Sequence, residues 1–162
     1  MVDMSQNGWP VHKTSQDLIS FVAAGVTWKA PNADVVTVAR YVINRFAQEV
    51  EPIAGKPLDD WSWAYRPIRD QTSGFSNHAS ATAWDLNATQ HPRGQHGTFT
   101  DHQVTAIRRI LRDLAALVSG VHVIRWGGDY VHATIDSMHF EINVAPSVVA
   151  KVARIIRGKA LS

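Results

Sequence analysis

The chain has no cysteine, which excludes disulfides and thiolate metal ligands. A transition metal would have to be bound through histidine and carboxylate side chains, so the eight histidines are the residues to examine. The chain also has little net charge. Its formal net charge is +2, and the basic residues form no patch with interleaved aromatics. This gives no ground for nucleic-acid binding, although mild positive charge suits an anionic cell-wall polymer.

Long apolar runs are missing too. No run approaches the length of a transmembrane helix, so we expect no membrane insertion. The N-terminal segment, MVDMSQNGWPVHK, lacks the charged and apolar regions of a signal peptide. We therefore expect synthesis in the cytoplasm, with release by another agent if the protein acts on a cell wall.

The composition is that of an ordinary globular protein, with 45% apolar and 19% charged residues. A chain of 162 residues fits one domain and can bury a core without disulfide staples. No repeat, low-complexity tract or linker-like stretch divides it. We predict one domain over residues 1–162, with a monomer as the favoured state.

Two helices are predicted in the N-terminal third. Thr14 and Asp17 resemble a capping box, and the apolar run after them stops at Gly25, which predicts a short first helix. Helical spacing of apolar residues predicts a second helix over residues 33–50, with Asn32 or Asp34 as its cap.

Two further helices are predicted in the C-terminal half. Thr100 and Gln103 form a capping box that begins the third helix, and Gly120 follows its apolar stripe as a stop. Pro146 opens the last helix at its first turn, and Gly158 is expected to end it.

Four short stretches rich in aromatic or β-branched residues predict strands. They are WSWAYR (61–66), ATAWDLN (81–87), VHVIRW (121–126) and MHFEINV (138–144). Two precede the third helix and two follow it. This order indicates an α+β fold, with a small, mainly antiparallel sheet and helices packed against one face.

Two of these stretches contain the residues that suggest chemistry. His78 lies seven residues before Asp85, and Asp85 lies on an apolar strand, where a lone carboxylate is costly to bury. In DSMHFEI, alternation places His139 and Glu141 on one face, and Asp136 precedes His139 by three residues. Two histidines and one carboxylate would form a catalytic zinc set with an open fourth position. The alternative is a buried His–Asp hydrogen bond that orders a loop.

The two segments together resemble the D-alanyl-D-alanine carboxypeptidase and L-alanyl-D-glutamate endopeptidase group of zinc peptidases. SNHASATAWD is similar to its Ser-x-His-x-x-Gly-x-Ala-x-Asp signature, and DSMHFE to its second signature, an acidic residue, two spacers and His. RWGGDY (125–130) and HPRGQHGTFT resemble endolysins of actinobacterial phages, and the NGWP and VEPI segments do so more weakly. The signature's glycine is Ala81 here, for which we expect a small geometric adjustment.

The resemblance implies a role for each matching residue. His78, Asp85 and His139 would bind one zinc ion per chain, and Asp136 would be the general base. Arg66, in the stretch AYRPIR, would stabilise the oxyanion, with Arg69 as its rival.

The resemblance and the remaining residues suggest further contacts and rivals. Ser76 is implied as a substrate contact, and Trp126 is the tryptophan we favour for wall binding. A second metal site at His91 and His96 is disfavoured, because Pro92, Arg93 and Gly94 between them indicate a turn. A serine triad around Ser76 fails because His78 already belongs to the stronger pattern.

The expected reaction is hydrolysis of an amide bond in a peptidoglycan stem peptide. The aspartate base, the RWGGDY stretch and the missing signal peptide favour the L-Ala–D-Glu bond and a phage endolysin. A D-alanyl-D-alanine carboxypeptidase is the first alternative. A non-catalytic, zinc-containing wall-binding module is the second, although such a module would have no use for a base at Asp136.

Overall fold

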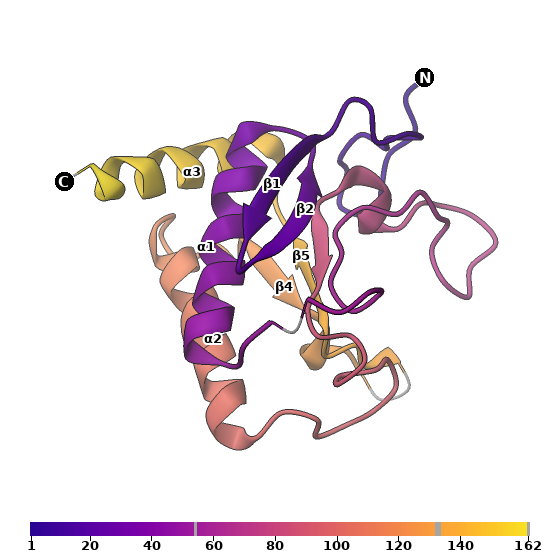
Figure 1. Ribbon diagram of the computed structural model, residues 1–162. Helices are drawn as coiled ribbons and strands as arrows, with labels where there is room; N and C mark the ends of the chain where they lie inside the picture. Colours follow the sequence, from indigo (N-terminus) through magenta and orange to yellow (C-terminus); the bar gives the residue numbers. More distant parts are fainter. Residues whose placement is uncertain (54, 132–133, 162) are drawn as a thin grey trace.

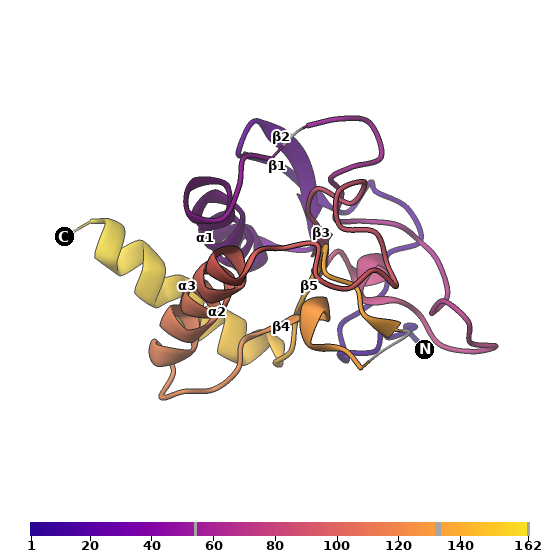
Figure 2. The ribbon, with the colours of Figure 1, turned by 90° about the horizontal axis from the view of Figure 1, so that it is seen from below.

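The computed structural model describes residues 1–53, 55–131 and 134–161. In this part of the chain the elements follow the order β1, β2, α1, η1, β3, α2, β4, η2, β5 and α3, where η denotes a 3₁₀-helix. The α-helices gather on one side of a central sheet, and long loops with the N-terminal segment lie on the other (Figure 1 and Figure 2). The prediction of an α+β fold with a small antiparallel sheet is confirmed.

The central sheet contains β3 (Ala83–Asp85), β4 (Ile124–Trp126) and β5 (His139–Ile142), in the order β3-β5-β4. Both pairings are antiparallel. These strands match three of the four predicted stretches, although each strand is shorter than the stretch that predicted it.

The strand register gives the sheet two chemically different faces. Asp85 pairs with His139, and Arg125 pairs with Glu141. Residues opposite each other in paired strands project from the same face, so these four polar side chains share one face. The other face carries Phe140 between its two tryptophan partners, all buried in the core.

Helix α1 (Ala33–Glu49) contacts both α2 (Asp101–Ala116) and α3 (Pro146–Ala160) and covers the apolar face. Its Phe46 packs edge-on against Phe140 of β5, with ring centroids 5.8 Å apart. Burial of this kind removes apolar surface from water and stabilises the sheet beneath the helices. The apolar face of the sheet is therefore buried against the helices, and the polar face is available to form a functional site.

The predicted ends of the helices are largely confirmed. Asn32 caps α1 by accepting a hydrogen bond from the Val35 N–H at 3.0 Å. Both hydrogen bonds of the capping box between Thr100 and Gln103 are formed. Helix α3 continues two residues beyond Gly158 to Ala160, because Gly158 does not adopt the positive φ of a helix-ending glycine.

The predicted first helix is wrong. Its residues form strand β1 (Ile19–Ala23), which pairs with β2 (Val26–Ala30) in a hairpin. The chain reverses through Ala24 and Gly25, whose φ angles of 49° and 75° are those that a two-residue hairpin turn requires. Gly25 is therefore the turn of a hairpin and does not end a helix.

The predicted strand over residues 61–66 is also wrong. Among the described residues it contributes one isolated bridge, between Trp61 and Asp85. In the described part of the chain, the backbone groups that follow do not pair with a strand. The Ala64 N–H donates a hydrogen bond to the His78 carbonyl oxygen at 3.2 Å, and Pro67 has no N–H to donate. The segment supports the neighbouring 3₁₀-helix instead of extending the sheet.

None of the described helices combines the length and the apolar character that a membrane crossing requires.

Candidate metal centre

The polar face of the sheet forms the floor of a pocket of about 400 Å³. The walls come from the N-terminal segment, the loop over residues 66–77, the loop before α2 and the segment between β4 and β5. The lining includes Asn7, Arg66, Asp85, Arg93, Asp136 and His139.

Three side chains converge at this floor. His78 Nε2 lies 3.2 Å from Asp85 Oδ1 and 3.2 Å from His139 Nδ1, and the last two atoms are 2.9 Å apart. In a tetrahedral zinc site with bonds of about 2.0–2.2 Å, the ligand atoms lie roughly 3.3–3.5 Å from one another. The three side chains are 0%, 3% and 9% exposed. The cluster therefore has the dimensions of a zinc site that is slightly contracted.

Local structure explains how each ligand atom reaches this point. His78 lies in η1 (Asn77–Ser80). Ser76 caps this 3₁₀-helix, and its Oγ accepts a hydrogen bond from the His78 N–H at 3.3 Å. Asp85 ends β3, and His139 begins β5 directly opposite it. The strand pairing thus supplies two of the ligand positions, and the capped turn supplies the third.

Hydrogen bonds on the outer side of each imidazole fix its orientation. The Nδ1 of His78 is 2.8 Å from the carbonyl oxygen of Ser62, and the Nε2 of His139 is 2.9 Å from Glu141 Oε2. A carbonyl oxygen can only accept, so Nδ1 of His78 carries a proton, and Nε2 is the ring nitrogen that faces Asp85 and can bind a metal ion. Such outer partners are usual for metal-binding histidines. Together with the carboxylate, this donor set fits a zinc ion.

The carboxylates and imidazoles of the cluster strongly affect one another's pKa values. Burial raises the pKa of Asp85, but the charges and hydrogen bonds of His78 and His139 outweigh it and hold that pKa well below its usual range. Burial lowers the pKa of His139, but hydrogen bonds to Asp85 and Glu141 raise it to about 10. The two carboxylates therefore stabilise positive charge at this point of the pocket.

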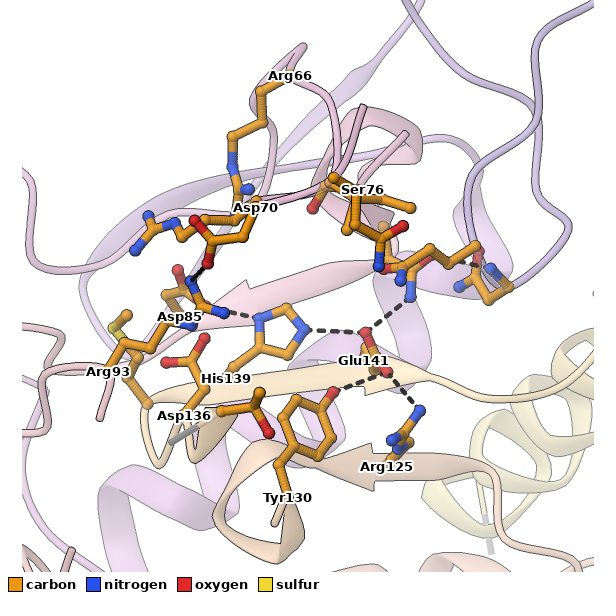
Figure 3. Close-up of a pocket in the computed structure, with 18 of the residues that line it drawn as sticks. Arg66, Asp70, Ser76, Asp85, Arg93, Arg125, Tyr130, Asp136, His139 and Glu141 are labelled. Atoms are coloured by element: carbon orange, nitrogen blue, oxygen red, sulfur yellow. Dashed lines mark hydrogen bonds and ion pairs between the residues drawn. The ribbon is translucent and has the colours of Figure 1, made fainter. Parts of the chain in front are cut away.

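Both oxygens of Glu141 are occupied (Figure 3). Oε2 accepts from Asn77 Nδ2 at 2.7 Å as well as from His139, and Oε1 accepts from the Tyr130 hydroxyl at 2.8 Å. Burial raises the pKa of Glu141, but the bonds to His139 and Asn77 outweigh it and lower that pKa to about 2. Glu141 is thus a positioning residue for His139, a role that sequence reasoning did not foresee.

Asp136 lies beside the cluster and is positioned by a glycine. Its N–H donates to the carbonyl oxygen of Gly127 at 2.9 Å, and a Cβ on Gly127 would lie 2.2 Å from the Asp136 carbonyl oxygen. Among the described residues, the Asp136 Oδ1 atom is buried without a hydrogen-bond partner. Burial raises the pKa of this carboxyl group. A buried acceptor without a partner needs a ligand or water in the pocket.

The remaining predicted site residues have different surroundings. Arg66 is half-buried and lines the pocket (Figure 3), where the nearby charges of Asp85 and Asp136 partly offset the lowering of its pKa by burial. Trp126 is 4% exposed, and its Nε1 donates to the Ser137 carbonyl oxygen at 2.8 Å. It does not line this pocket. Its proposed substrate contact stays a prediction, one that its burial does not favour.

Among the residues that the structure describes, the other histidines form no second cluster. His91 is buried between Thr98 Oγ1 at 2.8 Å and Glu51 Oε1 at 2.6 Å, whereas His96 is exposed. Within the described part of the chain, the one group that could hold a metal ion is His78, Asp85 and His139. Of the remaining histidines, His12 is half-buried, His102 and His122 are exposed, and His132 lies outside the described residues.

Comparison with known proteins agrees with this geometry. Residues 69–142 match a family model described as D-alanyl-D-alanine carboxypeptidase. This stretch of the chain is similar to that family. It includes the metal cluster, Ser76 and Asp136, and it begins after Arg66. Neither the curated proteins nor the solved structures gave a match.

Proposed function

We propose that this protein is a zinc-dependent peptidase that hydrolyses an amide bond in the stem peptides of peptidoglycan. One observation carries the proposal: the ligand atoms of His78, Asp85 and His139 converge beside the unpartnered Asp136 carboxylate, in a segment similar to D-alanyl-D-alanine carboxypeptidases. Zinc, when bound, would polarise the scissile carbonyl and lower the pKa of the attacking water.

The side chains of this protein would then move protons and stabilise charge. Asp136 accepts the proton of the attacking water and passes it to the leaving amine. Its raised pKa suits both steps, because a stronger base accepts more readily and still releases the proton to an amine. Arg66 has its guanidinium in the same pocket and stabilises the developing oxyanion.

The bond that we propose is L-Ala–D-Glu. An endopeptidase needs room for substrate on both sides of the bond. Arg66 and Arg93 lie on one side of His139 in the pocket, and Arg125 lies on the other (Figure 3). The aspartate base and the RWGGDY stretch favour the same bond.

The second candidate is a D-alanyl-D-alanine carboxypeptidase, which the description of the matching family favours. For the biological role we propose lysis of a host cell wall by a phage endolysin. This role rests on the resemblance of RWGGDY and HPRGQHGTFT to endolysins of actinobacterial phages.

Mass spectrometry of digested peptidoglycan tests the proposal. Purified peptidoglycan is incubated with the zinc-loaded protein, with protein stripped by a chelator, and with stripped protein to which zinc is restored. We expect fragments with a new amino group on D-Glu in the first and third samples and none in the second. Released D-alanine would select the carboxypeptidase instead. Binding to the wall without any released fragment would select the wall-binding module and reject hydrolysis.

A further inference from the structure

Three arginines line the pocket: Arg66, Arg69 and Arg93. They are close enough for the positive charges of Arg69 and Arg93 to lower the pKa of Arg66. Among the described residues, neither Arg66 nor Arg69 has a carboxylate within ion-pair distance, whereas Arg93 does. Guanidinium groups gathered in this way repel one another, and an anion bound between them would remove that repulsion.

The partner of Arg93 is an exposed carboxylate. Arg93 Nη1 lies 3.1 Å from Asp70 Oδ2, and the two side chains are 24% and 78% exposed (Figure 3). Asp70 lies on a loop and adopts a φ of 61°, a conformation that costs energy for a residue with a side chain. An ion pair with one partner so exposed contributes little stability. Asp70 can therefore be displaced from Arg93 by another carboxylate.

We infer that Arg93 binds a carboxylate of the substrate, and that Asp70 occupies this place when no substrate is bound. This inference rests on the proposed function, because it assigns part of the substrate to one wall of the same pocket. Arg93 and the proton acceptor Asp136 line that pocket together, near enough for the positive charge of Arg93 to lower the pKa of Asp136. The bound carboxylate would thus lie close to the bond that is cut.

The chemistry of the substrate gives the position of this carboxylate. In the γ-linked stem peptide, the carbon bonded to the scissile nitrogen of L-Ala–D-Glu carries the free α-carboxylate of D-Glu. In D-Ala–D-Ala, the same carbon carries the terminal carboxylate. Both candidate bonds therefore place a carboxylate on the leaving-amine side. A guanidinium offers two parallel N–H groups to such a group, which gives geometric specificity as well as attraction.

The test uses two stem peptides that differ in one group. One carries the free α-carboxylate on D-Glu, and the other carries the α-carboxamide. Their affinities are measured by calorimetry with zinc-loaded Asp136→Asn protein, in which hydrolysis of both peptides is expected to be too slow to disturb the titration. The same measurement is repeated after adding Arg93→Gln, Asp70→Asn or the control Arg154→Gln. Arg154 is an exposed residue of α3, so the control makes the same charge change away from the pocket.

We expect the carboxylate peptide to bind about ten to a hundred times more tightly than the carboxamide, the usual range for a charge-assisted pair. Arg93→Gln should abolish this preference, and Arg154→Gln should preserve it. Asp70→Asn should tighten binding of the carboxylate peptide several-fold, because it removes the internal competitor, and should leave the carboxamide unchanged. In protein with Asp136 intact, Arg93→Gln should raise KM for the carboxylate peptide and leave kcat within about a factor of three.

Equal affinity of the two peptides, a preference that survives Arg93→Gln, or no binding of either peptide would each overturn the inference. Failure of the proposed function gives a different result. Protein with Asp136 intact would then hydrolyse neither peptide and no wall fragment, while an Arg93-dependent preference in binding would still establish the carboxylate site.

Discussion

The side-chain amide of Asn77 donates a hydrogen bond to Glu141 at 2.7 Å, and the same Glu141 oxygen accepts from His139 Nε2 at 2.9 Å. The side-chain Oδ1 of Asn77 in turn accepts a hydrogen bond from the backbone N–H of Asn7 at 2.9 Å. A continuous set of hydrogen bonds therefore joins the N-terminal segment to a candidate metal ligand. Asn7 lies outside the segment that resembles known peptidases, yet it determines which way the Asn77 amide points.

Asn77→Ala should lower the zinc affinity of the protein by about 10- to 100-fold, the usual effect of removing a partner of a metal-binding histidine. Without the amide, Glu141 loses one of the donors that hold it against His139. Competition with a chromogenic chelator measures the affinity. The control is Asn143→Ala, an exposed pocket residue that does not contact the cluster and should bind zinc like the wild type. Unchanged affinity in Asn77→Ala would show that this hydrogen bond does not position the ligand.

The metal-free protein should become less stable as the pH rises from about 6.5 to about 10. The pKa of His139 is raised from 6.5 to about 10 on folding, so the folded protein binds more protons than the unfolded chain in this range. The stabilisation is fully present below pH 6.5 and is lost as the pH passes the folded value. Urea unfolding at several pH values should show a loss of up to about 1.4 kcal/mol per pH unit. The slope should flatten in His139→Gln, and stability that increases over this range would contradict the charge assignment.

Short sequence motifs correctly predicted the elements that depend on interactions between residues close together in the chain. The capping box at Thr100 predicted the start of α2, and short motifs pointed to the three candidate metal ligands whose side chains converge in the structure. The hairpin at Gly25 was mistaken for a helix, because a helix that ends at a glycine and a hairpin that turns at one both place apolar residues before it. The pairing of β1 with β2, which the apolar pattern does not reveal, distinguishes the two. Ser62 and Asn77 were missed because their roles depend on distant partners, to which sequence spacing gives no direct guide.

Gly127→Ala should slow hydrolysis at least about tenfold and lower stability by about 1–3 kcal/mol, as overpacking usually does. The added Cβ would lie 2.2 Å from the Asp136 carbonyl oxygen, so the backbone that positions Asp136 must shift. Zinc content should stay near one per chain, because no ligand belongs to this segment. The matched control is Gly158→Ala in α3, where nothing lies within 4 Å and stability should increase slightly. Wild-type hydrolysis in Gly127→Ala would show that this contact does not position the base.

Ala81→Gly should change the free energy of unfolding by less than about 1 kcal/mol, because two effects offset each other. Ala81 is fully buried at a φ of 54°, a left-handed conformation that costs an alanine about 1 kcal/mol. Glycine relieves this cost but removes a buried methyl group worth about 0.8 kcal/mol. Chemical denaturation of both proteins measures the difference. Destabilisation by more than about 2 kcal/mol would show that the methyl packing dominates.

The most direct test of the account is to measure zinc content and peptidoglycan hydrolysis on the same preparation of Asp136→Asn. The substitution keeps the size of the side chain and removes its ability to accept a proton. Because Asp136 lies outside the ligand cluster, we expect about one zinc per chain, as in the wild type. Hydrolysis should fall by about two to four orders of magnitude, the usual range for a lost general base. Hydrolysis near the wild-type rate at full zinc content would contradict the account, because the proton acceptor would then lie elsewhere.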